Sequence, residues 1–139
     1  PPVVIEPALP VARAESPATA AAPSAPVAES IQAERDIRLL LDAYRQSYDR
    51  LDVVSTAMLW PGVDTAALSR AFGTIASQQV EFDQCALDVL GERATARCNG
   101  SLHYVRRVGS STPQSRTLSW AFELNRSTGK WLISRVSAQ

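Results

Sequence analysis

The spacing of apolar residues changes once along this chain, near residue 80, and this change constrains the fold more than any other feature of the sequence. Before it, apolar side chains recur every three or four residues, as on a helix with one buried face. After it, they alternate with polar residues, as on strands with one buried face. Helices followed by strands predict an α+β domain, with the helices covering one face of a curved antiparallel sheet.

Three helices are expected in the first half of the domain. The first covers residues 30–51, begins after the favourable N-cap Ser30, and has a long apolar stripe. Asp52 caps a short second helix, and Asp64 caps a third in which Ile75 is the last apolar position. The stripe of the first helix consists of Ile37, Leu40, Leu41, Tyr44, Tyr48 and Leu51.

Four strands are expected after the change of period. Each alternates between apolar and polar residues, and short polar or Gly-containing segments separate them, which is typical of antiparallel neighbours. They cover residues 80–90, 93–105, 115–124 and 130–136.

Residues 1–30 differ in composition from the rest of the chain. They hold most of the Pro residues and many Ala residues, but no Gly and no aromatic residue. Such a segment buries too little apolar surface to offset the entropy of ordering it. We therefore expect a disordered Pro/Ala-rich linker at residues 1–30 and one folded domain at residues 31–139. A spacer of this kind indicates a tether to an upstream domain of the same polypeptide.

Composition argues against several classes of function. Acidic and basic residues balance at 14 each, and no aromatic residues are interleaved with the arginines, so nucleic acid is not an expected partner. No apolar run of about 18 residues is present, so we expect no membrane insertion of this segment. The chain has two Cys and one His, and the His faces away from both Cys on the expected strands. We therefore expect no metal site, and no motif indicates a cofactor.

The two cysteines flank a tight turn. If Gly91-Glu92 forms a two-residue hairpin turn, Leu90 pairs with Arg93 and, counting outward, Cys85 pairs with Cys98. This is a non-hydrogen-bonded position, where α-carbons lie about 4.5 Å apart and a disulfide fits. The same counting places both cysteines on the core face, together with Leu102 and Tyr104. Ala94, Ala96 and Gly100 on that face are small enough to leave room for a helix.

Two interpretations of the cysteines remain open. They are either buried free thiols, which would suit the cytoplasm, or a cross-strand disulfide formed outside the cytosol. We favour the disulfide, and with it a location on the extracytoplasmic side of a bacterial membrane.

Charge is unevenly distributed, because acids outnumber bases over residues 29–92 and bases outnumber acids over residues 93–135. The simplest interpretation of the basic residues is a solvated outer sheet face. The alternative is an interaction surface for an acidic partner or a second copy of the chain, giving a homodimer through the sheet face. The candidate residues for such a surface are Arg93, Arg97, His103, Arg107 and Arg116.

The segments "LLLDAYRQSYDRLD" and "RTLSWAFELNRSTGKWLISRV", the latter with a Gly turn followed by Trp-X-Ile, carry a family resemblance. Residues 31–139 resemble the nuclear transport factor 2-like superfamily, which includes SnoaL-like and ketosteroid isomerase-like domains. The resemblance implies a cone-shaped half-barrel with a pocket between helices and sheet. The segments "LWPGVD", "F-x-x-C" and "ATARC" resemble a bacterial subset found as C-terminal domains after Pro/Ala-rich linkers, some in proteins similar to membrane-anchored serine/threonine kinases.

The resemblance implies three possible functions. The first is a non-catalytic accessory module that binds a partner or a small apolar ligand, and we favour it. The second is an isomerase or dehydratase-type enzyme that uses an inner pocket. The third is a purely structural oligomerisation domain. The pocket candidates are Tyr44, Tyr48, Asp52 and Tyr104, although core tyrosines and a helix cap explain them more simply, and no residue is assigned a catalytic role.

Overall fold

The computed structural model describes residues 25–139, with side chains from residue 28 onward. Most of the expected linker at residues 1–30 therefore lies outside the described residues. Helix α3 spans Ala25–Asp49, so Ser30 lies inside the helix and is not the expected N-cap. The helix starts at residue 25 instead, and Pro26 lies in its first turn, where a Pro is tolerated because the backbone N–H it lacks has no helical acceptor. The chain divides into two units, Pro1–Gln32 and Ala33–Gln139, and the second unit holds the sheet and its core.

Two short helices follow, α4 (Val53–Leu59) and α5 (Thr65–Gly73). The expected caps are confirmed, because the carboxylates of Asp52 and Asp64 each accept a hydrogen bond from a backbone N–H of the following turn. Ile75 does not belong to α5, as had been expected, but is the first residue of a strand. The reason lies at Thr74, whose hydroxyl and backbone N–H both bond to the carbonyl of Ala71 and close the last helical turn.

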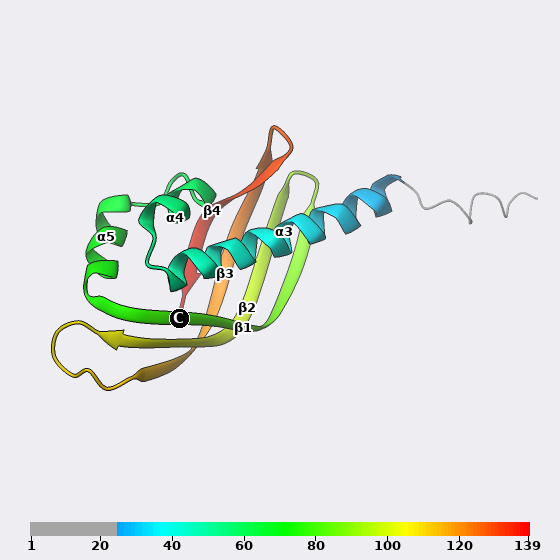
Figure 1. The fold of residues 1–139 in the computed structure, drawn as a ribbon. Coiled ribbons are helices and arrows are strands. Elements are labelled where there is room, and N and C mark those ends of the chain that lie inside the picture. The colour runs from blue at the N-terminus through cyan, green and yellow to red at the C-terminus, as the bar shows by residue number, and fades with distance from the viewer. Residues whose placement is uncertain (1–24) are drawn as a thin grey trace, which may run out of the picture. The chain divides into compact units, whose positions relative to one another are not determined.

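The strands form one antiparallel sheet in the order β1-β2-β3-β4. Figure 1 shows α3 lying across one face of this curved sheet, with α4 and α5 near one end of it. The expected fold class, three helices on a four-stranded antiparallel sheet, is confirmed. The strands are β1 (Ile75–Leu90), β2 (Arg93–Arg106), β3 (Gln114–Ser127) and β4 (Lys130–Ala138).

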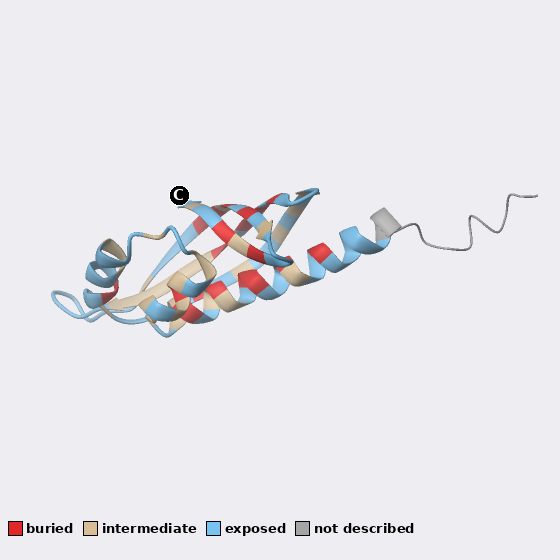
Figure 2. Ribbon diagram, turned by 90° about the horizontal axis from the view of Figure 1, so that it is seen from above, coloured by how far each residue is buried: buried red, intermediate tan, exposed pale blue. Residues whose placement is uncertain are grey.

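The core lies between α3 and the inner face of the sheet. Figure 2 shows the buried positions of α3 and of the strands in red. On α3 they repeat at helical spacing, and on β2 and β3 they alternate, which is the pattern expected from the sequence. The buried residues of α3 are Ala33, Ile37, Leu40, Leu41 and Tyr44, and those of the sheet are Val80, Ala94, Ala96, Cys98, Leu118, Trp120, Phe122, Leu124, Trp131 and Ile133.

Two polar bonds hold the end of α3 against β1. Gln78 Nε2 donates to the carbonyl of Tyr48 at 2.7 Å, and the backbone N–H of Val80 donates to Asp49 Oδ1 at 2.7 Å. β1 is an edge strand, so the N–H groups on its outer side have no strand partner. Asp49 satisfies one of them from the helix and thereby fixes the distance between α3 and this edge.

A bulge interrupts β1 at Asp83. The pairing shifts between Phe82, which faces Gly100, and Gln84, which faces Asn99. At Gly100 a Cβ atom would overlap the carbonyl oxygen of Glu81. Gly100 therefore leaves room for the bulged backbone of β1.

Candidate functional site

Cys85 and Cys98 form a disulfide, so the favoured interpretation of the two thiols is confirmed in this structure. They are directly paired between β1 and β2, with α-carbons 4.1 Å apart, and the predicted pairing of Leu90 with Arg93 also holds. Cys98 is fully buried in the core, whereas Cys85 is half-buried. The bond thus joins the edge strand to the interior of the sheet, just beside the bulge.

The disulfide gives a stability prediction. The double variant Cys85→Ala/Cys98→Ala should lose roughly 1–3 kcal/mol of unfolding free energy, less than the loop-closure value because the turn already closes this hairpin. Denaturant unfolding with and without reductant measures the loss. Reductant should weaken the natural chain and leave the double variant unchanged. Two free thiols in the denatured, unreduced protein would contradict the prediction and the extracytoplasmic location.

Tyr44 and Tyr48 lie together, one helical turn apart on α3. Their ring centroids are 4.4 Å apart, and Tyr44 is almost fully buried. Burial, followed by the neighbouring Tyr48, raises the pKa of the Tyr44 phenol well above its ordinary value. Burial also raises the pKa of Tyr48, against the opposing effect of a hydrogen bond with Tyr44. Both phenols therefore stay protonated near neutral pH and act chiefly as core residues.

The other two pocket candidates are engaged elsewhere. The carboxylate of Asp52 accepts from the Ser55 backbone N–H at 3.0 Å and from the Ser55 hydroxyl at 2.7 Å. These two bonds, the backbone one first, lower the pKa of Asp52. The Tyr104 hydroxyl donates to Gln114 at 3.2 Å, and the guanidinium of Arg106 lies over its ring. The structure brings the α3 tyrosines together, and no carboxylate of the described residues bonds to either phenol.

The Asp52 cap predicts a pH dependence. Asp52→Ala should lower stability at neutral pH, because the N-cap acceptor is lost. The folded pKa of Asp52 is below its unfolded value near 4, so the cap contribution is complete above that value and is lost as the pH falls through the folded pKa. Thermal unfolding between pH 7 and pH 2 measures this. The control is Asp52→Asn, whose side chain caps the helix but does not titrate. If the Asp52→Ala variant remained less stable than the natural chain by the same amount at pH 2 as at pH 7, the prediction would be contradicted.

Aromatic side chains fill the interior between α3 and the sheet. The Phe122 ring meets Tyr44 edge-on at 5.1 Å and Phe82 at 6.1 Å, and Phe82 meets Trp120 at 5.0 Å. Cross-strand register places no Asp, Glu or His on the inner face among the described strand residues. An acid or base for proton transfer inside the fold is therefore missing from the described part of the sheet.

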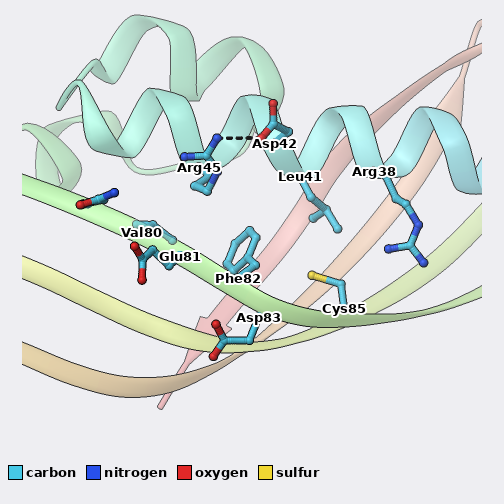
Figure 3. A pocket seen from close by; sticks show the side chains of 10 residues that line it. Arg38, Leu41, Asp42, Arg45, Val80, Glu81, Phe82, Asp83 and Cys85 are labelled. Atoms are coloured by element: carbon cyan, nitrogen blue, oxygen red, sulfur yellow. Dashed lines mark hydrogen bonds and ion pairs between the residues drawn. The ribbon is translucent and has the colours of Figure 1, made fainter.

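A groove of about 550 Å³ lies beside this packed interior, between α3 and the edge strand β1. Figure 3 shows Arg38, Asp42 and Arg45 along its helix side. Its strand side runs from Gln79 to Cys85 and includes the bulge, so the disulfide contributes to its wall. The groove is open to solvent and has apolar residues, Leu41 and Phe82 among them, between charged margins.

The charges of the groove are partly paired. Arg45 contacts Asp42 at 2.8 Å and Asp49 at 3.1 Å, which fixes one wall of the groove. Arg38 and Asp83 have no ion-pair partner among the described residues. Neither residue was predicted to belong to a site. The helical spacing of apolar residues in the sequence predicts that Arg38 faces away from the core. It does not predict that Arg38 lies beside the bulged strand β1.

The outer sheet face presents polar residues to solvent, as predicted for His103, Arg93 and Arg97. The ring of His103 lies 2.7 Å from Ser115 Oγ and 3.3 Å from Glu81 Oε1. Arg93 and Arg97 are exposed, and their register partners on this face include small or neutral residues. Within the described part of the chain, no cluster of three or more His, Cys, Asp or Glu side chains is arranged to hold a metal ion.

Two basic residues lie elsewhere than predicted. Arg107 follows the end of β2, and its backbone N–H donates to the carbonyl of Thr74 at 2.9 Å, so it is not on the sheet. Arg116 pairs with Leu102, two residues before Leu118, so its register places it on the inner-face side, although it is exposed. The outer-face cluster of the described chain therefore retains only Arg93, Arg97 and His103 from the predicted set.

No helix among residues 25–139 combines the length and the apolar character needed to cross a membrane.

No protein-family model matches the chain, and no curated protein matches it by sequence. Solved structures do match. A nuclear transport factor 2 (NTF2-like) superfamily protein from Salmonella enterica serovar Typhimurium superposes with a TM-score of 0.72 at 18% identity, covering 79% of this chain and 92% of that one.

Two further structures extend the likeness. An NTF2-like protein with a cystatin-like fold from Novosphingobium aromaticivorans has a TM-score of 0.63 at 19% identity, covering 79% of this chain and 82% of that one. The hexachlorocyclohexane dehydrochlorinase LinA-type3 from Novosphingobium barchaimii has a TM-score of 0.69 at 12% identity, covering 79% and 87%. Identities this low establish a shared fold without a shared activity. The chain therefore has the nuclear transport factor 2-like fold that its sequence resembles.

Proposed function

We propose that this domain is a non-catalytic binding module. The observation that supports this most is the filled interior, where Tyr44, Phe82, Trp120 and Phe122 occupy the space between helix and sheet. Proton-transfer chemistry needs an ionisable group at a reachable substrate position. In the described chain the inner face has no such carboxylate or imidazole, while open hollows lie at the surface.

The context of the module is part of the proposal. The Pro/Ala-rich composition of residues 1–30 supports a tether to an upstream domain in a larger bacterial protein, one similar to a membrane-anchored serine/threonine kinase. The disulfide supports the extracytoplasmic side of the membrane, since such bonds persist in oxidising compartments. The upstream domain is then the first partner of the module.

A single NMR experiment tests the absence of catalysis. The chain is incubated in heavy water with a small enolisable ketone, and proton exchange at the carbon next to the carbonyl is followed. Exchange should proceed at the buffer rate, because the described interior offers no base. An exchange rate above that of the buffer would contradict the proposal if Tyr48→Phe or Asp52→Asn lowers it and the exposed Val54→Asp variant does not. The enzyme alternative would then be favoured.

A second proposal is a homodimer through the outer sheet face. The small side chains of Ala86 and Ala121 flank Arg97 there, which leaves a low surface that another sheet can approach. Sedimentation equilibrium tests this with Ala121→Arg, which should convert a dimer to a monomer. A monomeric natural chain at high concentration would exclude the dimer and leave the binding module standing.

A further inference from the structure

A second hollow, of about 400 Å³, lies where α3, the end of α4 and the β3–β4 turn meet. Its walls are mainly apolar and include Leu39, Leu40 and Leu59. Leu39 is 66% exposed, so a large aliphatic side chain faces solvent at this hollow. A space of this size fits a small molecule of roughly ten to fifteen heavy atoms better than a protein segment.

Trp131 forms part of the wall and carries an unsatisfied donor. The residue is 4% exposed, and its Nε1 atom is buried without a hydrogen-bond partner, the only such side-chain nitrogen or oxygen in the described chain. A buried donor without an acceptor costs about 1–3 kcal/mol. Most buried indole N–H groups have an acceptor, so this one is suited to an acceptor supplied from outside the chain.

The charge around the hollow favours an anionic acceptor. Lys130 is one of the residues that line the hollow, and the guanidinium of Arg126 lies 5.3 Å from the centre of the Trp131 ring. Neither has an ion-pair partner among the described residues. Asp36 also lines the hollow, but it already has an interaction within the chain. Two cations against one engaged acid leave an excess of positive charge for a carboxylate.

We infer that this hollow binds an apolar monocarboxylate. The aliphatic or aromatic body lies against Leu39, Leu40 and Leu59, and the carboxylate accepts from Trp131 Nε1–H beside Lys130. The nitrogen is covered in this structure, so binding includes a local movement of the wall that lets the carboxylate reach it. The inference rests on the proposed function, for which it names a ligand class and a site.

The experiment uses the indole N–H signals of the intact chain in heteronuclear NMR. The chain has three Trp residues, so three indole peaks are expected, and Trp131→Phe identifies one of them. Titration with decanoate should move the Trp131 peak to a saturable end point and leave those of Trp60 and Trp120 in place. Decyltrimethylammonium, with the same tail and a cationic head, should leave all three in place. Comparison with 2-naphthoate shows whether an aliphatic or an aromatic body is preferred.

Surface variants keep the test independent of core stability. Lys130→Gln should weaken decanoate binding several-fold, and Leu39→Asp should abolish it. Val54→Asp alters an equally exposed apolar residue outside the hollow, and should bind decanoate as the natural chain does. An unmoved Trp131 peak, or equal binding of both head groups, would overturn the inference. Decanoate binding that perturbs only residues outside the hollow would overturn the inference and leave the proposed binding function intact. Accelerated ketone exchange would instead overturn the proposed absence of catalysis and leave the decanoate result as it is.

Discussion

Gly100→Ala should destabilise this domain by about 3 kcal/mol, more than any other one-methyl change that the structure suggests. The added Cβ would overlap the carbonyl oxygen of Glu81 and lie 2.8 Å from its carbonyl carbon and 3.0 Å from Phe82 Cα. These are backbone atoms, so no side-chain rotation relieves the clash. The bulge in β1 must move or lose its pairing. Urea unfolding gives the free-energy change, and the melting temperature should fall by roughly 10–20 °C.

Gly62→Ala is the matched control. A Cβ at Gly62 meets no atom within 4 Å, and the residue has no positive φ angle, so the same chemical change should alter stability by less than about 0.5 kcal/mol. A Gly100→Ala variant as stable as this control would mean that the bulge at Asp83 is not held against β2. The groove between α3 and β1 would then lack its fixed strand wall.

The contrast between the hairpin and the bulge shows how far the sequence predicts this fold. Pairing of Cys85 with Cys98 followed from the two-residue turn at Gly91, because a tight turn determines the register of the strands beside it. The bulge at Asp83 was not predicted, although the apolar positions of β1 change phase there, where the step from Phe82 to Cys85 is three residues and not two. A bulge also depends on what the partner strand can accommodate, and Gly100, which faces Phe82 on β2, has no side chain to block it.

The misplacement of Arg116 has a different cause. The alternation of Leu118, Trp120, Phe122 and Leu124 was read correctly, and one further step places Arg116 on the same side. Its charge had suggested the outer face. At the end of a strand the inner-face side is open to solvent, so a charged residue can lie there. The odd or even position of a residue along the strand, and not its polarity, decides the side on which it lies.

The hollow at Trp131 could not be predicted from the sequence, since an unsatisfied indole N–H is recognised only once the positions of all its neighbours are known.

Phe122→Ala should cost about 3–5 kcal/mol, the largest loss from truncating one side chain in this domain. Phe122 is 1% exposed and its ring meets both Tyr44 and Phe82 edge-on, so its removal takes a shared packing partner from two aromatic rings. Met58→Ala, at a position 66% exposed, is the control and should change little. Both are measured by urea unfolding. A cost below about 1 kcal/mol for Phe122→Ala would show that the interior collapses easily and is poorly packed.

The same variant tests whether the interior is filled, which is the basis for proposing a module without catalysis. An apolar cavity left by the removed ring should stay dry and bind benzene. Benzene should therefore raise the melting temperature of Phe122→Ala, by mass action, and leave that of the natural chain unchanged. If benzene stabilises both chains equally, the natural interior already has space for a ligand between α3 and the sheet. The isomerase or dehydratase alternative would then regain the inner pocket that it requires, with the Tyr44 and Tyr48 phenols at its wall.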